Sequence, residues 1–407
     1  MRRSFLFLQG VCSPFFARLA DRLSADGHRV FKINFNAGDL LYWGGRPAWN
    51  YRGKLAGLRA FLDEKYRQQG ITDQVLFGDR RPVHRPAVDL ASSLGIRTHV
   101  FEEGYLRPHW VTLEREGVNG HSLLPRDPDW FRRVGARLPD YRNGKPFHAP
   151  FSARVAHDVC YHLAGVANPV LFSAYRTHAP VNAAIEYAGY LKRFALLPLY
   201  RRQDDALIDR LIAGRQPFYL LPLQLNGDAQ IRDHSRFNDM NDLMEFVMAS
   251  FTRHAPDNAR LLIKNHPLDM GLRNYRRVIA GLEKRFALTG RIDYIESGDL
   301  GKLLPAARGV VTVNSTLGCL SVGVGCPTVA LSDPIYNLPG LTFQGKLDEF
   351  WGNQSRPEAE LFRCFRNAVI HTTQVNGGFY CRDGISMAVN DSLRLLEPER
   401  SPLDELL

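Results

Sequence analysis

The sequence predicts an α/β protein built from two Rossmann-like domains with a helical insertion. Short apolar segments typical of buried strands alternate with segments in which apolar residues recur at helical spacing, and this alternation predicts parallel sheets. It runs twice along the chain and is interrupted between residues 118 and 200, where aromatic, proline and arginine residues are frequent. A length of 407 residues also exceeds what a single hydrophobic core usually organises.

The first series begins with a strand, a glycine-containing turn and a helix. Phe5–Leu8 is an apolar strand, Gln9–Pro14 forms the turn, and Phe15–Ala25 carries its apolar residues at helical spacing. The series continues with strands over Val30–Asn34, Val75–Asp79 and Thr98–Glu102 and a helix over Val88–Leu94. We expect residues 1–205, including the helical insertion at 118–200, to form the N-terminal domain.

A second series of strands and helices starts near Pro217. The expected strands are Phe218–Leu223, Arg260–Lys264, Ile292–Ile295, Gly309–Val313 and Pro327–Leu331, and the expected helices include Met240–His254 and Arg273–Arg285. Residues 206–356 form the C-terminal domain in this prediction, and residues 357–407 add closing helices. Ligands of doubly wound sheets bind outside the carboxyl ends of the strands, so the polar residues that follow the strands are the candidate site.

The composition restricts the classes of function. A formal net charge of +10 suits an anionic partner, which could be a nucleic acid, an anionic lipid or a nucleotide sugar. The arginines are scattered and no nucleic-acid-binding motif is present, so nucleic acid is not expected as a partner. The six cysteines form no Cys-x-x-Cys pair, which indicates reduced core thiols and no zinc site.

The hydropathy indicates a cytoplasmic protein. No run of about 18 or more apolar residues is present, so no transmembrane helix is expected. The apolar residues near the start of the chain are interrupted at Gln9 and Pro14, which favours a buried first strand over a signal peptide.

Two carboxylates lie at the end of the strand over Thr98–Glu102. Glu102 and Glu103 precede a glycine turn and Arg107, an arrangement that can supply an acid/base group beside an anion-binding guanidinium. A surface turn with a solvated charge pair explains the same spacing equally well.

Polar residues also crowd the end of the first strand of the second series. Gln224, Asn226, Asp228 and Gln230 lie in this segment, and Asp233 follows it. A carboxylate in this position, such as Asp228, could attack an anomeric carbon. Asn-Gly-Asp is also common in Asx turns and helix caps, so the spacing alone leaves both interpretations open.

Two further strand ends carry groups suited to phosphate. The segment Lys264-Asn265-His266-Pro267 places a histidine donor at the end of a buried strand, where the proline fixes the backbone. Asn314, Ser315 and Thr316 follow a later strand at the start of a helix, where hydroxyls and backbone amides bind anions. His266 could instead be structural, and Ser315 could be a helix N-cap while it also binds an anion.

The combination of these segments resembles a known family. The His266-Pro267 and Ser315-Thr316 pairs are similar to the CMP-binding motifs of bacterial GT-B sialyltransferases and Kdo transferases, and two Rossmann-like domains with a central cleft are the GT-B layout. The whole set resembles the capsule polysaccharide biosynthesis family of KpsS/LipB type, with the related KpsC-type enzymes. The segments that carry the resemblance are Leu8-Gln9-Gly10 with Phe15-Phe16, Glu102 to Arg107, Gln224 to Ile231 with His234-Ser235, His266-Pro267, Asn314 to Thr316, Tyr336 with Gly340 to Thr342, and Asn376 to Tyr380.

The resemblance implies a retaining β-Kdo glycosyltransferase with CMP-Kdo as its donor substrate. A KpsS-type member adds the first Kdo of the capsule polysaccharide linker to a phosphatidylglycerol-type lipid, as a peripheral protein at the inner face of the inner membrane. The single set of motifs fits this initiating enzyme. The implied partners are CMP-Kdo, the phospholipid acceptor, an anionic membrane surface and other capsule assembly proteins. Neither cofactor nor metal is expected, because CMP is already a good leaving group.

The resemblance also suggests residue roles. Asp228 is the candidate nucleophile, with Asp233 as its competitor, and Glu102 is the candidate acid/base for the acceptor hydroxyl. Related sequences often have Asp at the position of Glu103, which leaves open which of the two carboxylates acts. The candidate substrate-binding residues are His266, Lys264, Asn314, Ser315, Thr316, Arg107, Gln224, Gln230, Gln9 and Gly10, the last two in the acceptor-side domain.

Other functions remain as alternatives. A non-catalytic capsule polysaccharide export or binding protein would need no nucleotide pocket. A GT-B-shaped epimerase would bind a UDP-sugar in place of a CMP-sugar. A transferase of another nonulosonic acid would keep the same site and change only the sugar.

Overall fold

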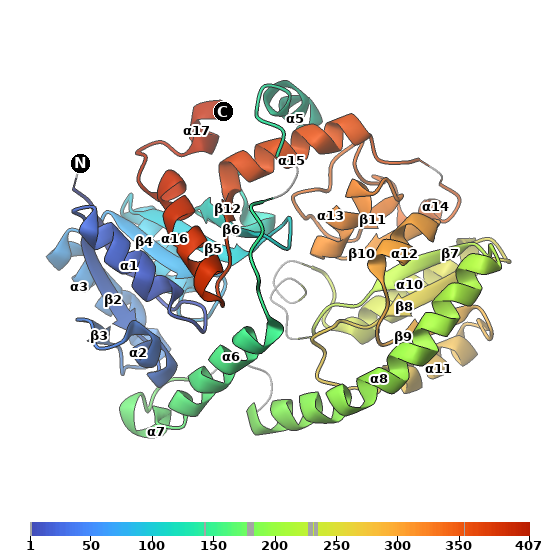
Figure 1. Cartoon of the computed structure of the whole chain (residues 1–407), viewed down its shortest axis with the longest axis horizontal. Coiled ribbons are helices and arrows are strands. Elements are labelled where there is room, and N and C mark those ends of the chain that lie inside the picture. Colours follow the sequence, from blue (N-terminus) through green and yellow to red (C-terminus); the bar gives the residue numbers. More distant parts are fainter. Residues whose placement is uncertain (1, 142–143, 177–182, 227–230, 232–234, 354) are drawn as a thin grey trace. The chain divides into compact units, whose positions relative to one another are not determined.

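The chain folds into two compact α/β units (Figure 1). The computed structural model describes residues 2–141, 144–176, 183–226, 231, 235–353 and 355–407. Unit 1 comprises Met1–Pro125, Arg137–His178 and Arg366–Leu407, and unit 2 comprises Arg126–Ala136 and Ala179–Phe365. Each unit has its own mainly parallel sheet, which confirms the predicted α/β class with two Rossmann-like domains.

Unit 1 is built on a seven-stranded sheet. Its strands are β1 (Ser4–Phe7), β2 (Arg29–Asn34), β3 (Trp49–Asn50), β4 (Asp73–Phe77), β5 (Arg97–Glu103), β6 (Trp110–Arg115) and β12 (Gln374–Asn376). They lie in the order β12-β6-β5-β4-β1-β2-β3. The strands from β3 to β5 are parallel, whereas β6 pairs antiparallel with β5 and β12 pairs antiparallel with β6. The first strand is therefore an interior strand of the sheet, as the sequence predicted.

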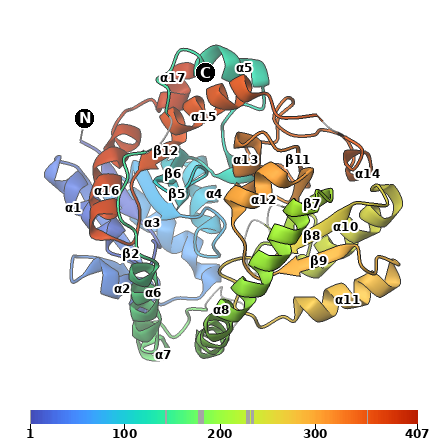
Figure 2. The same ribbon diagram turned by 45° about the vertical axis from the view of Figure 1, so that its right-hand side comes forward.

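Helices cover both faces of this sheet (Figure 2). The helices of unit 1 are α1 (Phe15–Ala25), α2 (Ala37–Trp43), α3 (Leu58–Gln69), α4 (Arg85–Ser93), α6 (Phe151–Gly165), α7 (Asn168–Leu171), α16 (Arg382–Leu396) and α17 (Pro402–Leu406), with 3-10 turns η1 (Leu55–Gly57) and η2 (Asn119–His121). Phe5 and Phe7 of β1 share a core with α1 and α16, whereas Leu6 shares a core with α3 and α4. Successive strand residues thus enter opposite cores, which explains the continuous apolar run.

Unit 2 is built on a five-stranded, wholly parallel sheet in the order β11-β10-β7-β8-β9. Its strands are β7 (Phe218–Pro222), β8 (Arg260–Lys264), β9 (Ile292–Ile295), β10 (Gly309–Thr312) and β11 (Thr328–Ala330). Its helices are α5 (Pro128–Gly135), α8 (Ala183–Ala213), α10 (Met240–His254), α11 (Tyr275–Arg285), α12 (Leu300–Ala306), α13 (Thr316–Gly323), α14 (Leu347–Phe350) and α15 (Ala359–Thr373). Helix α15 continues into unit 1. Tyr219 and Leu221 share a core with α10 and α11, and Phe218 and Leu220 share one with α8 and α12. Both faces are therefore covered.

The unit boundaries differ from the expected domain boundaries. Helix α8, expected in the insertion of a domain over 1–205, belongs to unit 2 together with α5. Residues from Arg366 onwards, expected as part of an appended set of helices, belong to unit 1, where β12 joins the sheet. A strand of three residues has too little periodicity to be recognised in a sequence. Among the described residues, no helix is long and apolar enough to cross a membrane.

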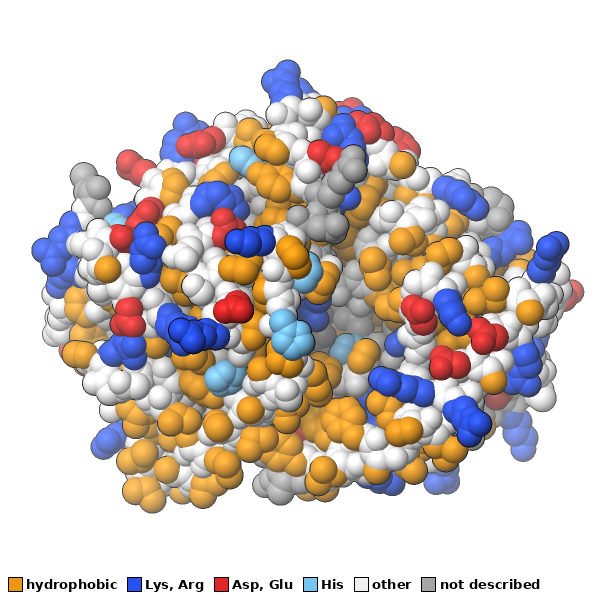
Figure 3. Space-filling model, viewed as in Figure 1, with side chains coloured by type: hydrophobic (Ala, Val, Ile, Leu, Met, Phe, Trp, Pro, Cys, Tyr) orange, Lys and Arg blue, Asp and Glu red, His pale blue; other side chains and the backbone are white. Residues whose placement is uncertain are grey.

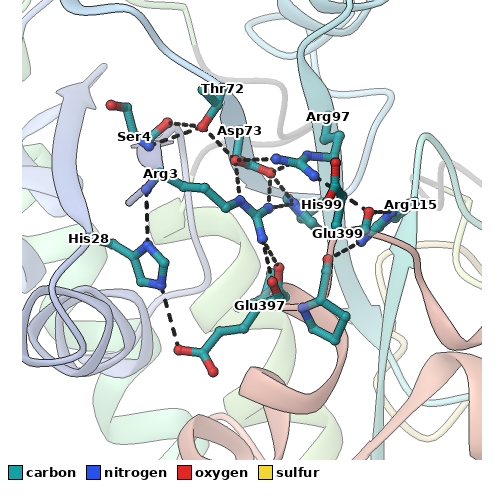
Figure 4. Close-up of polar contacts among 12 residues, drawn as sticks. Arg3, Ser4, His28, Thr72, Asp73, Arg97, His99, Arg115, Glu397 and Glu399 are labelled. Carbon is teal, nitrogen blue, oxygen red and sulfur yellow. Dashed lines mark hydrogen bonds and ion pairs between the residues drawn. The ribbon is translucent and has the colours of Figure 1, made fainter. Parts of the chain in front are cut away.

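A buried ion cluster joins the amino-terminal ends of the parallel strands of unit 1 (Figure 4). The fully buried carboxylate of Asp73 accepts from Arg3 Nε at 2.8 Å and contacts Arg3 Nη2 as well. His99 Nε2 lies 2.9 Å and Arg97 Nε 3.0 Å from Asp73 Oδ1. Burial alone would raise the pKa of Asp73, but hydrogen bonds from His99 and Arg3 outweigh burial and hold this pKa well below its usual range.

The arginines beside this cluster also bind the segment that follows α16. Arg3 Nη1 donates to the carbonyl oxygens of Leu396 at 2.6 Å and Glu397 at 2.9 Å. Arg115 donates to the carbonyl oxygens of Pro398 at 2.7 Å and Glu399 at 2.9 Å. Charged hydrogen bonds therefore attach residues 396–399 to Arg3, which directly precedes β1, and to Arg115 of β6 (Figure 4).

Replacing Asp73 with Asn should destabilise the protein strongly. The substitution leaves the buried guanidinium of Arg3 without its counter-charge, which costs roughly 3–5 kcal/mol in comparable buried pairs. The free energy of unfolding in urea measures the loss. Because the pKa of Asp73 is lower in the fold than in the unfolded chain, its contribution is fully present above about pH 4 and is lost as the pH falls below that value.

The matched control is Asp63→Asn. This change removes an ion pair with Arg67 at 2.9 Å on the exposed side of α3, and such pairs are worth less than about 1 kcal/mol. Similar losses in the two variants would show that the Asp73 cluster contributes no more than a surface ion pair.

Candidate functional site

Unit 2 brings several predicted site residues to one edge of its sheet. All five strands are parallel, so their carboxyl ends meet at the same edge. Gln224 follows β7, Lys264 ends β8, and Asn314 follows β10. Because β10, β7 and β8 are neighbours in the sheet, these residues lie on three adjacent strand ends.

Gln224 and Asn314 form a reciprocal amide pair. Gln224 Nε2 donates to Asn314 Oδ1 at 3.0 Å, and Gln224 Oε1 accepts from the backbone N–H of Asn314 at 3.3 Å. Gln224 is buried, so the pair fixes the loops after β7 and β10 relative to each other. The structure thus joins two residues that the sequence predicted separately, and Gln224 positions Asn314.

Ser315 is the N-cap of α13. Its side chain accepts from the backbone N–H of Leu317 at 3.2 Å, and its carbonyl oxygen accepts from Tyr336 Oη at 2.6 Å. Gly318 is required here, because a β-carbon at this position would collide with the Tyr336 hydroxyl. The capping interpretation of Ser315 is therefore confirmed. The first turn of α13 still presents backbone N–H groups and the partly exposed Thr316, which are suited to an anion.

The loop after β8 determines which nitrogen of His266 carries the proton. The backbone N–H of Leu268 donates to His266 Nδ1 at 3.1 Å, so the neutral ring has its proton on Nε2. Asn265 supports the turn, because its Oδ1 accepts from the His266 backbone N–H and its Nδ2 donates to Glu296, both at 2.8 Å. His266 is partly exposed, and its Nε2–H is a neutral hydrogen-bond donor at this edge.

Lys264 is buried at the end of β8, at 5% exposure. Its Nζ donates to the carbonyl oxygen of Asn265 at 3.3 Å. Burial, followed by the charge of Arg193, lowers the pKa of Lys264 to about 8, and Asp204 partly opposes this shift. The ammonium group therefore supports the backbone of the His266 loop, a structural role that sequence spacing did not reveal.

Arg193 of α8 holds the same loop from the other side. Its side chain is buried, and Nη1 donates to the carbonyl oxygens of Pro267 at 2.8 Å and Asp269 at 2.7 Å. Nη2 donates to the carbonyl oxygen of Glu296, after β9, at 3.2 Å. The sequence pattern did not predict a role for Arg193. The signal for it was an arginine on the buried side of a mainly apolar helical segment.

Two further residues of α8 complete this support. A β-carbon at Gly189 would lie 2.5 Å from the carbonyl oxygen of Met270, so glycine allows the helix to approach the loop closely. Asp204 Oδ2 accepts from the backbone N–H groups of Glu296 at 3.0 Å and Ser297 at 2.9 Å. Helix α8 therefore positions the loops after both β8 and β9.

In unit 1, the two predicted glutamates end β5 at the carboxyl edge of the parallel strands. Glu103 forms ion pairs with Arg154 of α6 at 3.1 Å and with Arg107 at 3.7 Å. Glu102 Oε1 accepts from the backbone N–H of Glu103 at 3.0 Å, and Oε2 lies beside Gly78. Successive strand residues point to opposite faces, so the two carboxylates have different surroundings, and Arg107 is engaged by Glu103.

Gln9 and Gly10 belong to a buried polar network at the end of β1. Gln9 is 1% exposed, and its Nε2 lies 3.4 Å from Asp39 Oδ2 and 3.3 Å from Tyr161 Oη. Arg81 Nη1 donates to Gln9 Oε1 at 3.3 Å and to the carbonyl oxygen of Gly10 at 2.9 Å. These contacts join β1 to α2 and α6. A contact with the acceptor remains a prediction for both residues.

The candidate nucleophile Asp228, its competitor Asp233 and the candidate sugar contact Gln230 lie outside the described residues. Their roles remain predictions. The start of the segment is fixed by Asn226, whose Oδ1 accepts from the Met240 backbone N–H at 2.9 Å and whose Nδ2 donates to Tyr275 Oη at 2.6 Å.

In the part of the chain that the structure describes, no group of three or more His, Cys, Asp or Glu side chains could hold a metal ion. The Asp-x-Asp pair Asp127 and Asp129 starts α5. Asp127 caps the helix through the Asp129 N–H at 2.9 Å, and Asp129 pairs with Arg132 at 2.7 Å. The six cysteines are free thiols, but only Cys319, Cys326 and Cys364 are buried in a core as predicted, and Cys160 is exposed.

Two Rossmann-like units, with polar groups collected at the carboxyl ends of their strands, define a GT-B-like α/β protein. The chain belongs to the capsule polysaccharide biosynthesis protein family, whose model matches residues 72–380. It is 36% identical over 380 residues to the capsule polysaccharide export protein KpsS of Escherichia coli, covering 93% of this chain and 97% of KpsS. These matches confirm the family resemblance.

Other relatives include capsule polysaccharide modification protein LipB of Neisseria meningitidis serogroup B, 35% identical over 387 residues, or 93% of this chain and 91% of LipB. Among solved structures, the chain is similar to the β-Kdo 2,7-transferase KpsC of Thermosulfurimonas dismutans. That match has a TM-score of 0.43 and 13% identity, and it covers 97% of this chain and 99% of the other.

Arg193→Met should loosen the His266 loop. A single hydrogen bond from a charged donor is worth about 1.5–3 kcal/mol, so the free energy of unfolding should fall by at least this amount. The backbone amides of the loop should also exchange faster with deuterium, because their positions depend on the carbonyl groups that Arg193 holds. Hydrogen exchange read by mass spectrometry, with urea denaturation, measures both effects.

Arg201→Met on the exposed side of the same helix is the control. It should change the unfolding free energy by no more than about 0.5 kcal/mol and leave loop exchange unchanged. Unaltered loop exchange in Arg193→Met would contradict the positioning role.

Proposed function

We propose that the protein is a retaining glycosyltransferase that moves Kdo from CMP-Kdo to a phosphatidylglycerol-type lipid and so starts a capsule polysaccharide linker. The observation that carries the proposal is the carboxyl edge of unit 2. There the His266 donor, the start of α13 and the paired Gln224 and Asn314 lie on adjacent strand ends. Membership of the capsule polysaccharide biosynthesis family supplies the sugar-polymer context.

The phosphate of CMP-Kdo is the ligand proposed for this edge. The start of α13 offers backbone N–H groups and the positive end of a helix dipole, and Thr316 adds a hydroxyl. His266 adds a neutral donor whose direction is fixed by Leu268. These groups stabilise the charge that develops on the departing CMP, so the proposed reaction uses neither metal nor cofactor.

The sugar transfer is proposed to proceed through two inversions. Asp228 attacks the anomeric carbon and CMP leaves. The acceptor hydroxyl, deprotonated by Glu102, then attacks the same carbon and releases Asp228. Glu102 is proposed as the base because Glu103 forms ion pairs with Arg154 and Arg107.

The proposed setting is the cytoplasmic face of the inner membrane, where the protein would meet the lipid acceptor and other capsule assembly proteins. A capsule polysaccharide export protein is the main alternative, because the similar KpsS of Escherichia coli carries that name. A UDP-sugar epimerase is the second. A ligand that binds the folded state raises the unfolding temperature, so stabilisation by CMP favours the transferase, stabilisation by UMP the epimerase, and stabilisation by neither the export protein.

His266→Ala should lower kcat/KM for CMP-Kdo by about 10- to 150-fold. The expected loss is one hydrogen bond to a charged phosphate, worth about 1.5–3 kcal/mol. Transfer to phosphatidylglycerol is measured in the presence of EDTA. The control His254→Ala removes an exposed histidine 3.3 Å from Asp348 and should leave kcat/KM unchanged. A folded His266→Ala protein with normal kcat/KM would make His266 a purely structural residue.

Asp228→Asn should abolish transfer while the protein still folds and binds CMP. The amide cannot form the covalent sugar intermediate that a double inversion requires. Incubation of the unmodified protein with CMP-Kdo and no acceptor should leave one Kdo on Asp228, detected by intact-mass measurement and peptide mapping. An adduct on Asp233 would reassign the nucleophile, and a product of inverted configuration would exclude the mechanism.

A further inference from the structure

Helix α8 has an outward face that is apolar. Its inward residues, among them Gly189, Arg193 and Asp204, contact the loops after β8 and β9. The opposite side is exposed at the helical spacing of three to four residues. We call these exposed residues the outward face of α8: Ile185, Ala188, Leu191, Lys192, Ala195, Leu199 and Arg202.

Three aliphatic side chains of this face are more than half exposed. Ile185 is 53% exposed, Leu191 73% and Leu199 56%. A surface helix normally turns its apolar side to the core and its polar side to water. Here the inward side buries the charged Arg193 and Asp204, while aliphatic side chains lie on the exposed side, so the outward face is suited to a partner that removes it from water. Figure 3 shows hydrophobic side chains gathered over the first half of α8, with Lys and Arg side chains near them.

The charges on this part of α8 indicate the chemistry of the partner. From residue 185 to 202, the exposed charged side chains are those of Lys192, Arg201 and Arg202. A further exposed arginine, Arg276, lies beside the helix with its guanidinium 5.7 Å from the Tyr200 ring. Within residues 185–202 the carboxylate of Glu186 is half-buried, and exposed carboxylates begin at Asp205. An apolar strip flanked by cations complements a partner that presents anionic groups at its surface and apolar groups beneath them.

An anionic phospholipid bilayer fits these charges better than a second copy of the chain. Two copies joined through this face would bring Lys192 and Arg202 towards other cations, which repel. The helix is also not apolar enough to cross a membrane. A helix with aliphatic residues and flanking Lys and Arg lies instead in the plane of the lipid headgroups.

We propose that the outward face of α8 docks on the surface of a membrane that contains anionic phospholipid. The inference rests on the proposed function only for the identity of the acceptor, and it adds the surface by which the protein reaches that acceptor. The same helix holds the His266 loop through Arg193. Docking through α8 would therefore hold the proposed donor-binding loop at a fixed distance from the lipid.

Vesicle flotation tests the charged part of the surface. The probe is phosphatidylcholine vesicles with or without phosphatidylglycerol, and no nucleotide sugar is added. The triple variant Lys192→Gln, Arg201→Gln, Arg202→Gln should bind phosphatidylglycerol vesicles about 100-fold more weakly, because each cation near an anionic surface contributes about fivefold. The matched control Arg52→Gln, Lys54→Gln, Arg59→Gln changes three exposed cations and the net charge equally, and it should change binding less than about threefold.

The apolar part is tested by Leu191→Ser with Leu199→Ser. This variant should bind the same vesicles at least about tenfold more weakly, because the two serines remove apolar area that the bilayer would take out of water. The control Leu55→Ser with Leu123→Ser replaces leucines that are 49% and 46% exposed in unit 1, and it should bind normally. Thermal unfolding confirms that all variants are folded.

Equal losses in the α8 variants and their controls would overturn the proposal, since they would indicate attraction by net charge alone. So would normal vesicle binding by both α8 variants. A change of oligomeric state in the leucine variant, measured by sedimentation with vesicle binding unaltered, would assign the face to a second copy. Flotation uses no donor nucleotide sugar, so a protein that does not bind the vesicles refutes only the docking proposal. A protein that binds the vesicles but does not bind CMP refutes only the transferase proposal.

Discussion

The carboxylate of Asp73 can remain buried only while positive partners surround it, and this requirement organises unit 1. Arg3 and His99 supply the partners from the strands on either side of β4. Arg3 also binds the carbonyl groups at Leu396 and Glu397. The charged side chains at the amino-terminal edge of the parallel strands therefore stabilise the fold. Glu102 lies at the opposite edge, where the strands end.

Local patterns predicted the regular elements well because each pattern was complete within its own segment. Two helices and one strand have the expected bounds, because their apolar periodicity and flanking residues suffice to define them: Phe15–Ala25, Met240–His254 and Arg260–Lys264. The assignment of α8 to unit 2 and of β12 to unit 1 depends on contacts between distant residues. Arg193 bonds to carbonyl groups more than seventy positions away, and backbone carbonyls leave no trace in a sequence.

The candidate site was predictable to the same extent. Three residues were correctly predicted to lie at one edge of the sheet because each follows a predicted strand: Gln224, His266 and Ser315. The alternation of strands and helices predicts that these strands are parallel, so their carboxyl ends share one edge. The capping role of Ser315 was one of the interpretations that its position allowed, and the structure confirms it. The pairing of Gln224 with Asn314 was not predictable, because it depends on side-chain geometry between neighbouring loops. The Lys264 side chain is buried in the fold, and the spacing of residues in a sequence cannot reveal this.

The three separate stretches of unit 1 affect the order in which the protein can form. During synthesis, unit 2 ends at Phe365, before the stretch Arg366–Leu407 that unit 1 needs has been made. Until then β6 lacks its partner β12, and the core around Phe15 lacks the residues of α16. An unpaired strand edge beside uncovered aromatic residues is prone to aggregation. Unit 1 therefore begins the chain but is completed last, and it is the unit that a ribosome-bound or shortened chain leaves exposed.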